Sequence, residues 1–492
     1  MAESNPSTYC YQGIDWTRSL MGDDIVLGSN QSAVNVLLVN YYMQDPAYRN
    51  SSNLSNTRHW FGYAQGINDA NKLLKYSNYL DIKTSDDAKN TFYKSDAYAR
   101  VIRAFSYMSL MEEYTPFYGS MKNKEAANSG LSIYRTYDPV RKGVARSNAK
   151  ETWEFIKGDL DTAYNDLRAI DVDITTNYAA GELEDIDLSV VDFLRARAGL
   201  LIEDWSYCAE ACRRIVESKK YSFIAKDNWG GRLVNNGKDG DGHDKLVVLP
   251  ETNAFTALSK NPETIFGLKM KSTNDDDSKK KYFFKVANIF GTYSANTGDS
   301  GSQALINDVL YGKIVTGDCR KAAFIEPTTS FSSYKFFDGS VGKVQSLANL
   351  KFAATCGLSD EGQSHIDDAT KCQDMEYTKF RYSEVILMYT EALMHGAGTD
   401  PTVYINQLRT ARGAEPLESV TQSDIECEWS IEMWGEGGRE YYNHKRWGKD
   451  IKRASESNHW SKNGYTVANM TIPFPQREQE DNKEWAEDTT NL

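Results

Sequence analysis

The stretch IECEWSIEMWGEGGREYYNHKRWGKD occupies residues 425–450 and decides how the C-terminal part of the chain folds. Its first ten residues predict a helix, because the apolar side chains of Cys427, Ile431 and Trp434 recur at helical spacing. Three glycines at positions 435–438 then supply the backbone freedom with which helices commonly end. We therefore expect a helix that stops at these glycines and a second, short helical segment after them.

Basic and aromatic residues follow the glycines. Arg446 and Trp447 are adjacent, and an Arg beside a Trp more often packs along the ring as a structural contact than it reaches for a ligand. We predict that Arg439 and Trp447 tie the glycine-rich turn to the helices around it. Residues 380–398, FRYSEVILMYTEALMHGAG, form a helical segment before this stretch, and residues 471–482, TIPFPQREQEDN, form a loop after it.

The order of residues across these segments resembles the C-terminal signature of SusD/RagB-like outer-membrane glycan-binding lipoproteins. The resemblance spans most of the chain and is strongest after residue 378. The residues that carry it are Arg381, Tyr382, Glu384, Leu387, Glu391, Ala392, Asn406, Arg409, Arg412, Gly413, Gly435, Glu436, Gly437, Arg439, Arg446, Trp447 and Gly448.

This resemblance implies both a fold and a function. The fold would be mainly α, with a tetratricopeptide-like helical-repeat scaffold and a loop-rich, partly β region. The function would be non-catalytic binding of oligosaccharide or polysaccharide at the cell surface, and its delivery to a SusC-like TonB-dependent transporter of the outer membrane. Family members carry a lipid anchor. The start MAESNPSTYC has no signal peptide and no apolar run before Cys10, so we expect that the export segment was removed.

Composition limits the classes of protein and partner. The 492 residues are 40% hydrophobic and 12% aromatic, which is ample for a large core. The formal net charge of -13 argues against a nucleic-acid partner and against docking on an anionic lipid surface, because both need clustered basic side chains. No apolar run of about twenty residues occurs, so no transmembrane helix is predicted.

The seven cysteines are scattered and lack the paired spacing of a zinc site. Cys208 and Cys212 are four residues apart on a predicted helix, so their side chains line up along it and are interpreted as small core residues. A disulfide between Cys356 and Cys372 would be compatible with an extracytoplasmic location, but the sequence does not establish one.

Helical periodicity recurs on both sides of a less regular region. The first predicted helix runs from Trp60 with Asn56 and Thr57 as its caps, and residues 98–114 form its partner, with apolar residues on two faces. Stacked helix pairs are the natural architecture, although no regular 34-residue period is visible. Further helices are predicted at 153–167, 190–201, 207–215 and within 378–437.

We divide the chain into 1–219, 220–375 and 376–492, and expect one interwoven structural unit.

Residues 220–375 are rich in Gly, Asn, Asp and Ser, and they contain short candidate strands at 245–249 and 263–271. We expect this region to bind the ligand, because a sugar offers apolar C–H faces that need exposed aromatic rings beside polar side chains. The predicted glycan-binding residues are Trp229, Tyr282, Tyr293 and Tyr334, with Trp60 as a fifth candidate that could equally belong to the core.

Other motifs suggest enzymatic or metal chemistry only weakly. GDSGS at 298–302 imitates a serine-protease loop, but no His lies in a recognisable partner motif. Asp239, Asp241, His243 and Asp244 resemble part of a calcium loop, but the Gly at its sixth position and the carboxylate at its twelfth are missing. We predict no cofactor and no catalytic metal. Two alternatives stay open: a helical scaffold that binds protein or peptide, and a glycoside hydrolase with a pair of carboxylates.

Overall fold

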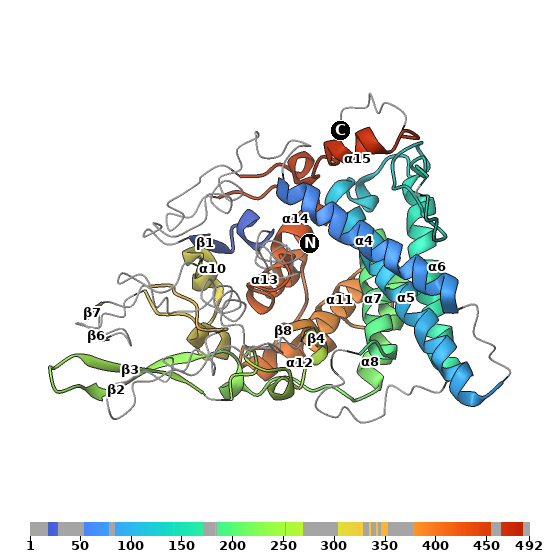
Figure 1. The fold of residues 1–492 in the computed structure, drawn as a ribbon. Coiled ribbons are helices and arrows are strands. Elements are labelled where there is room, and N and C mark those ends of the chain that lie inside the picture. The colour runs from blue at the N-terminus through green and yellow to red at the C-terminus, as the bar shows by residue number, and fades with distance from the viewer. Residues whose placement is uncertain are drawn as a thin grey trace.

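The computed structural model describes residues 18–27, 54–77, 84–140, 142–170, 183, 185–250, 252–268, 304–327, 334–335, 341–342, 346–352, 377–453 and 464–485. Figure 1 shows a body of long helices on the right and short strands on the left. The helices of the C-terminal part lie between these two halves. The described chain is mainly helical, as the sequence predicts.

The N-terminal helices pack in sequence order. Helix α4 (Leu54–Ser77) packs against α5 (Asp86–Tyr114), and α5 also packs against α6 (Ala149–Ala169). Because α5 has a neighbour on both sides, it buries side chains from two faces, including Val101 and Tyr107. The position of α5 inside a helical layer therefore explains why its sequence has apolar residues on two faces.

Two of these helices begin earlier than the sequence indicates. Helix α4 starts at Leu54, so the prediction that Asn56 and Thr57 cap it is wrong, and both residues lie within its first turns. Helix α5 starts at Asp86, where Ser85 accepts a hydrogen bond from the backbone N of Ala88. The first turns of α5 are largely exposed, so they lack the apolar stripe from which a helix can be predicted.

A close helix pair connects the N-terminal and C-terminal parts. Helix α7 (Leu188–Ile202) packs against α8 (Trp205–Glu217), and α8 packs against α11 (Tyr382–Met394). Almost every residue of α11 is buried, which explains why its sequence is apolar on all sides. Cys208 and Cys212 are buried in α8 and form no disulfide, as predicted, whereas Cys356 and Cys372 lie outside the described residues.

The C-terminal helices are α12 (Thr402–Arg412), α13 (Gln422–Glu432), α14 (Arg439–Arg446) and α15 (Gln476–Asp481). The glycine-rich turn lies between α13 and α14, and Gly435, Gly437 and Gly438 all have positive φ angles. L-amino acids with a side chain rarely adopt this conformation. The prediction of a helix, a glycine turn and a second short helix is therefore confirmed.

The strands form small sheets. β1 (Ile25–Leu27) pairs with β5 (Ala304–Ile306), and β4 (Thr264–Leu268) pairs with β8 (Tyr377–Arg381), both antiparallel. The third sheet has the order β2-β3-β6-β7. Its strands are Arg232–Lys238, Asp244–Leu249, Tyr334–Lys335 and Val341–Gly342. The remaining elements are α10 (Asp308–Lys313) and 3-10 turns at Tyr118–Ser120, Lys226–Asn228, Leu258–Lys260, Cys319–Ala323 and Val467–Met470.

The described residues bury two hydrophobic cores. The larger one fills the spaces between the helices. The second combines the N-terminal segment, the loop-rich region and the end of α13 with the turn that follows it, for example through Ile25, Trp229 and Trp434. Parts that are distant in sequence thus share one core; the division at residues 219 and 375 and the single interwoven unit stay predictions. No helix in the described ranges is long and apolar enough to cross a membrane.

Candidate functional site

The predicted glycan-binding residues do not come together in the described structure. Tyr282 and Tyr293 lie outside the described residues, and Tyr334 begins β6, where its backbone pairs with Gly342 of β7. The nomination of Trp229 as an exposed sugar platform is wrong, because only 2% of this residue is exposed.

Trp229 is a core residue for a clear physical reason. Its ring contacts Phe255 edge-on at 5.2 Å between centroids, and Nζ of Lys351 lies 4.9 Å from the ring centre. The amine of Lys351 donates in turn to the backbone oxygens of Glu432 and Trp434. The loop around Trp229 therefore folds over the end of α13, and contacts from distant segments bury a ring that the local sequence suggests is exposed.

Trp60 is also a core residue, with 5% of its surface exposed. Its ring makes edge-on contacts with Tyr114 at 5.0 Å, Phe474 at 5.5 Å and Trp485 at 5.9 Å. Its indole Nε1 donates to Oε2 of Glu478 on α15 at 3.1 Å. Trp60 thus attaches α15 to the start of α4, and its remaining edge borders a cavity.

This cavity, which we call the α4–α15 cavity, has a volume of about 350 Å³. It lies between α4, α5, the segment 131–143 and α15, on the helical side of the molecule (Figure 1). Its lining residues are Trp60, Phe61, Ala64, Gln65, Ile67, Asn68, Asn71, Tyr107, Leu110, Leu131, Ser132, Tyr134, Thr136, Asp138, Lys142, Gly143, Glu478, Asp481 and Asn482.

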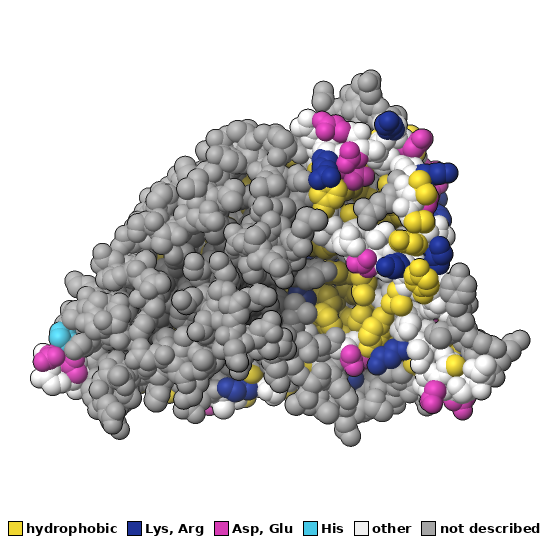
Figure 2. All heavy atoms as spheres, in the orientation of Figure 1, with side chains coloured by type: hydrophobic (Ala, Val, Ile, Leu, Met, Phe, Trp, Pro, Cys, Tyr) yellow, Lys and Arg dark blue, Asp and Glu magenta, His cyan; other side chains and the backbone are white. Residues whose placement is uncertain are grey.

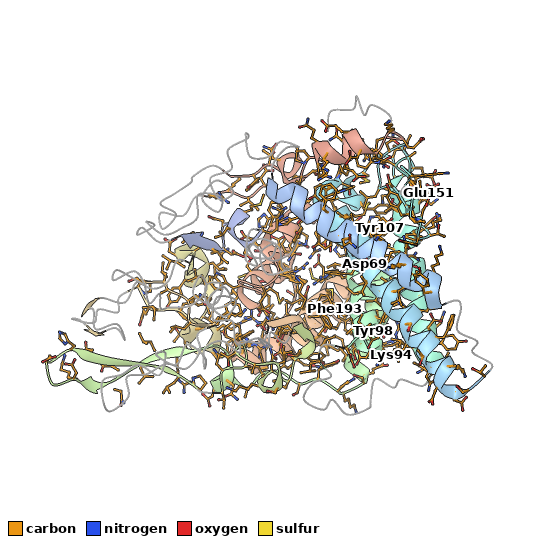
Figure 3. The ribbon with its side chains drawn as sticks, in the orientation of Figure 1. Asp69, Lys94, Tyr98, Tyr107, Glu151 and Phe193 are labelled. Atoms are coloured by element: carbon orange, nitrogen blue, oxygen red, sulfur yellow. The ribbon has the colours of Figure 1, made fainter. Side chains whose placement is uncertain are left out.

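The inner wall of the cavity is held in place by hydrogen bonds. Tyr107, labelled in Figure 3, donates from its hydroxyl to the backbone O of Ser132 and accepts from the backbone N of Tyr134. Asn71 of α4 donates to the backbone O of Tyr134 at 2.8 Å. Arg103 donates to Oδ1 of Asn71 and pairs with Asp159. The segment 131–143 is therefore attached to both α4 and α5, so the cavity is preformed.

The outer wall is closed by the chain around α15. Asn482 donates to the hydroxyl of Tyr134 at 3.2 Å and to the backbone O of Val144 at 3.1 Å. Burial raises the pKa of Glu478, and the hydrogen bond from Trp60 only partly offsets it. Burial also raises the pKa of Tyr134 to about 12, so this hydroxyl remains protonated at neutral pH.

The lining has the chemistry of a binding site. Phe61 and Tyr134 are half-buried aromatic rings, and the amides of Gln65 and Asn68 lie on the same face of α4 as Phe61. Among the described lining residues there is no His or Cys that could serve as a nucleophile, base or soft metal ligand. Two further cavities have volumes of about 20 and about 10 Å³, which is no more room than a water molecule needs.

The sequence signals this cavity through a second stripe on α4. Trp60, Tyr63, Ile67 and Ala70 recur at helical spacing and are buried in the core. A second set follows one position later and consists of Phe61, Ala64, Asn68 and Asn71. This set contains one aromatic residue, one small residue and two amides. Such a composition is typical neither of a helix face buried in a core nor of a charged, solvent-exposed face. The prediction of α4 rests on apolar residues alone, so it does not include this second set.

The signature residues near the C-terminus build a buried ion-pair network. Arg381 pairs with Glu263, Glu432 and Glu436 at 2.7 to 2.9 Å. Arg412 bridges the same Glu263 and Glu432 at 2.6 and 2.8 Å. All five side chains are buried, so these residues hold the loop-rich region onto the C-terminal helices.

The interpretation of the neighbouring Arg and Trp as a structural contact is confirmed. The guanidinium carbon of Arg446 lies 4.7 Å from the ring centre of Trp447, and both side chains donate to the buried carboxylate of Glu391. Arg439 lies apart from this pair, over the ring of Tyr442 and 3.6 Å from Glu384. Trp447 is therefore held by Arg446 and Glu391, whereas Arg439 contacts α11.

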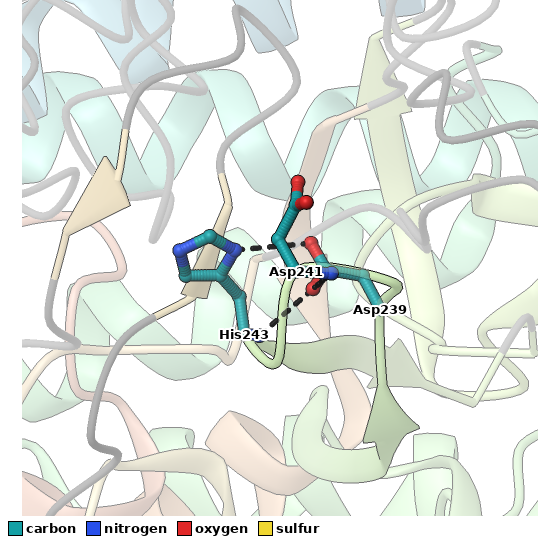
Figure 4. A group of neighbouring side chains, drawn as sticks. All are labelled: Asp239, Asp241 and His243. Atoms are coloured by element: carbon teal, nitrogen blue, oxygen red, sulfur yellow. Dashed lines mark hydrogen bonds and ion pairs between the residues drawn. The ribbon is translucent and has the colours of Figure 1, made fainter.

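The calcium-like motif forms the tip of the β2–β3 hairpin, shown in Figure 4. Donor atoms of Asp239, Asp241 and His243 lie within 4.8 Å of one another. Oδ1 of Asp239 accepts from the backbone N of Asp241 and of His243, and Oδ2 contacts Nδ1 of His243 at 3.2 Å. These contacts stabilise a hairpin turn and account for the cluster.

Comparison with known proteins identifies the family. A sequence profile of the SusD family matches residues 234–491, which is more than half of the chain. The chain therefore belongs to the SusD family. The search of curated protein sequences found no significant match to the chain.

Solved structures share the fold across nearly the whole chain. A SusD superfamily protein from Bacteroides thetaiotaomicron superposes with a TM-score of 0.70 at 17% identity, covering 97% of this chain and 95% of its own. A SusD-like carbohydrate binding protein from Bacteroides vulgatus gives 0.70 and 17%, covering 100% and 95%. Surface glycan-binding protein A from B. thetaiotaomicron, in complex with laminarihexaose, gives 0.65 and 16%, covering 96% and 93%. At these identities the likeness establishes the SusD-like fold; a regular repeat within it stays a prediction.

Proposed function

We propose that this protein binds oligosaccharide or polysaccharide at the cell surface without turning it over, and delivers it to a SusC-like TonB-dependent transporter. The observation that carries the proposal is the match of residues 234–491 to the SusD family. The protein acts as a lipoprotein of the outer membrane, because that is the location of the family.

Two features support a glycan as the ligand. Surface glycan-binding protein A, which shares the fold over 96% of this chain, is seen in complex with laminarihexaose. The α4–α15 cavity combines aromatic rings with amide and carboxylate side chains, and sugars are recognised by this mixture of surfaces. The SusC-like partner and the delivery step are proposed on the ground of family membership alone.

The proposal is tested by a binding screen with the purified chain. Purified neutral and acidic polysaccharides, including laminarin, are immobilised and bound protein is measured, with calorimetry on the oligosaccharides of each positive polymer. We expect saturable binding of at least one glycan. Binding of peptides or unfolded protein in place of every glycan would support the helical scaffold alternative and contradict the proposal.

A further inference from the structure

We propose that the α4–α15 cavity receives the end of a neutral glycan chain and disfavours acidic glycans. This inference rests on the proposed function and adds to it a location and a chemical class of ligand. Its basis is the size of the cavity, the side chains that line it and the balance of charge at its rim.

The size suits a chain end. A volume of about 350 Å³ lies at the lower end of the range of small-molecule sites, roughly room for one or two sugar rings. A longer chain would have to continue outside, over the exposed rim formed by Thr136 and Asp138 on one side and Asp481 on the other. The cavity would therefore bind a terminus or a short oligosaccharide in preference to the middle of a polymer.

The lining can contact both the apolar C–H faces and the hydroxyl groups of a sugar. Phe61 comes from α4 and Tyr134 from the segment 131–143, so an apolar C–H face can pack on rings from two different segments. Gln65 and Asn68 carry amides that both donate and accept, as hydroxyl groups do. The inner wall is already fixed by hydrogen bonds, so little conformational entropy would be lost on binding.

The charges of the lining favour a neutral ligand. Asp138, Glu478 and Asp481 are acidic, and Lys142 is the one basic residue among the described residues that line the cavity. A carboxylate or sulfate on a sugar is usually met by an Arg or Lys. Arg103 lies behind the inner wall, but its Nε and Nη2 already donate to Asp159. Arg477 is not among the lining residues; its guanidinium lies over the ring of Phe61 and pairs with Asp481.

The geometry also favours a sugar over a peptide. Extended peptides often add to an exposed strand edge through backbone hydrogen bonds. The walls formed by α4, α5 and α15 are helical, so most backbone groups there are used within the helices and side chains make the contacts. A ligand that presents many hydroxyl groups and no repeating backbone amides fits this surface better.

The test fills the cavity and leaves its supports intact. Ala64→Phe adds a ring to the cavity wall, and Lys72→Phe adds the same ring to an exposed position of α4 outside the cavity. Calorimetry is carried out with the neutral oligosaccharide that binds the wild-type chain. We expect at least tenfold weaker binding for Ala64→Phe, unchanged binding for Lys72→Phe, and native melting temperatures for both.

A second variant covers the case in which Ala64→Phe does not fold. Asn68→Ala removes only one amide, and we expect roughly threefold to tenfold weaker binding, as for the loss of one hydrogen bond.

To test charge selectivity, the same oligosaccharide is oxidised at C6 to a uronic acid. We expect at least tenfold weaker binding than for the neutral form, and a smaller difference in Asp138→Lys.

The outcomes separate this inference from the proposed function. Wild-type affinity of folded Ala64→Phe and Asn68→Ala for the neutral glycan would show that the sugar binds elsewhere, which overturns the inference and leaves the proposed function standing. Equal or tighter binding of the oxidised form would overturn the charge argument. Absence of binding to every glycan tested would overturn both.

Discussion

Glu432 shows how a single residue joins the parts of this molecule. Its carboxylate contacts Arg381, Arg412 and Arg320, which come from three separate segments. Burial raises the pKa of Glu432, but the charges of the three arginines outweigh burial and hold it well below its usual range. The residue is therefore ionised in the folded state, and its charge is needed to compensate the arginines around it.

Removing this carboxylate should destabilise the fold strongly. In Glu432→Ala the buried arginines lose a shared counter-charge, and we expect a loss of about 3–5 kcal/mol in the free energy of unfolding. Urea denaturation measures the effect. As the matched control, Arg213→Ala removes an exposed pair with Glu217 and should cost less than about 1 kcal/mol. Equal effects of the two variants would contradict the structural role of the network.

A pair of carboxyl groups should make the stability depend on pH. Burial, and then the nearby charge of Glu440, raise the pKa of Asp24 to about 8, and burial raises the pKa of Glu440 to about 7. The folded state therefore keeps protons that the unfolded chain, with carboxyl pKa values near 4, releases. The pair contributes its full stabilisation of the folded state below about pH 4. As the pH rises towards 8, the unfolded chain releases the protons that the folded state keeps, so the free energy of unfolding falls.

Replacing Asp24 tests this dependence. Asp24→Asn removes one titrating group and the like charge beside Glu440, so its melting temperature should rise relative to the wild type as the pH increases from about 4 to 8. Thermal unfolding followed by circular dichroism at several pH values measures the difference. Parallel melting curves across this range would show that Asp24 does not keep its proton in the folded protein.

At the scale of the elements, the close approach of α7 and α8 depends on a glycine. A Cβ at Gly199 would lie 2.6 Å from the backbone N and 2.9 Å from the Cα of Cys208, and backbone atoms cannot move aside cheaply. Gly158 lies in the middle of α6, and a Cβ there would meet nothing within 4 Å. The two glycines therefore have opposite roles in otherwise similar helices.

Substitution by alanine should separate these roles. Gly199→Ala should cost about 1–3 kcal/mol of stability, because it forces the two helices apart. Gly158→Ala should add about 0.5–1 kcal/mol, because alanine is the better helix former. Denaturant unfolding of both variants checks the signs, and a stabilising Gly199→Ala would show that α7 and α8 are not in close contact.

Elements with a strong apolar stripe could be predicted from the sequence, because burial of one face leaves a period in the residues. Helix α6 is an example. The turn after α13 could be predicted for a different reason, because its three glycines permit positive φ angles. The exposed start of α5 leaves no such period, so the sequence does not predict it. The loop-like local sequence of Trp229 predicts exposure, although contacts with Phe255 and with the distant Lys351 bury it. Long-range contacts of this kind cannot be derived from local pattern.

The candidate site shows the same limit. The predicted glycan-binding residues are aromatic residues whose neighbours in the sequence are typical of loops. The α4–α15 cavity instead forms where α4 meets a segment some 70 residues later and another near the C-terminus. Figure 2 shows why composition alone is a poor guide, because hydrophobic side chains also appear on the described part of the surface, between charged groups.

At the scale of the whole molecule, the protein should be found with a membrane partner. If it delivers glycan as proposed, the native, lipid-anchored protein should co-purify from outer membranes with a TonB-dependent barrel in mild detergent. Mass spectrometry of the purified complex checks this. Recovery of the protein without any barrel, while another lipoprotein–barrel pair from the same membranes stays intact, would count against the partnership.

The most direct test of the account measures binding and turnover in one sample. The purified chain is titrated with the oligosaccharide that the screen identifies, and the same mixture is then incubated and assayed for new reducing ends. Non-catalytic glycan binding predicts a saturable heat of binding, and a reducing-end signal equal to that of the oligosaccharide alone. A steady release of reducing ends, lost on denaturing the protein, would contradict the account and identify a glycoside hydrolase.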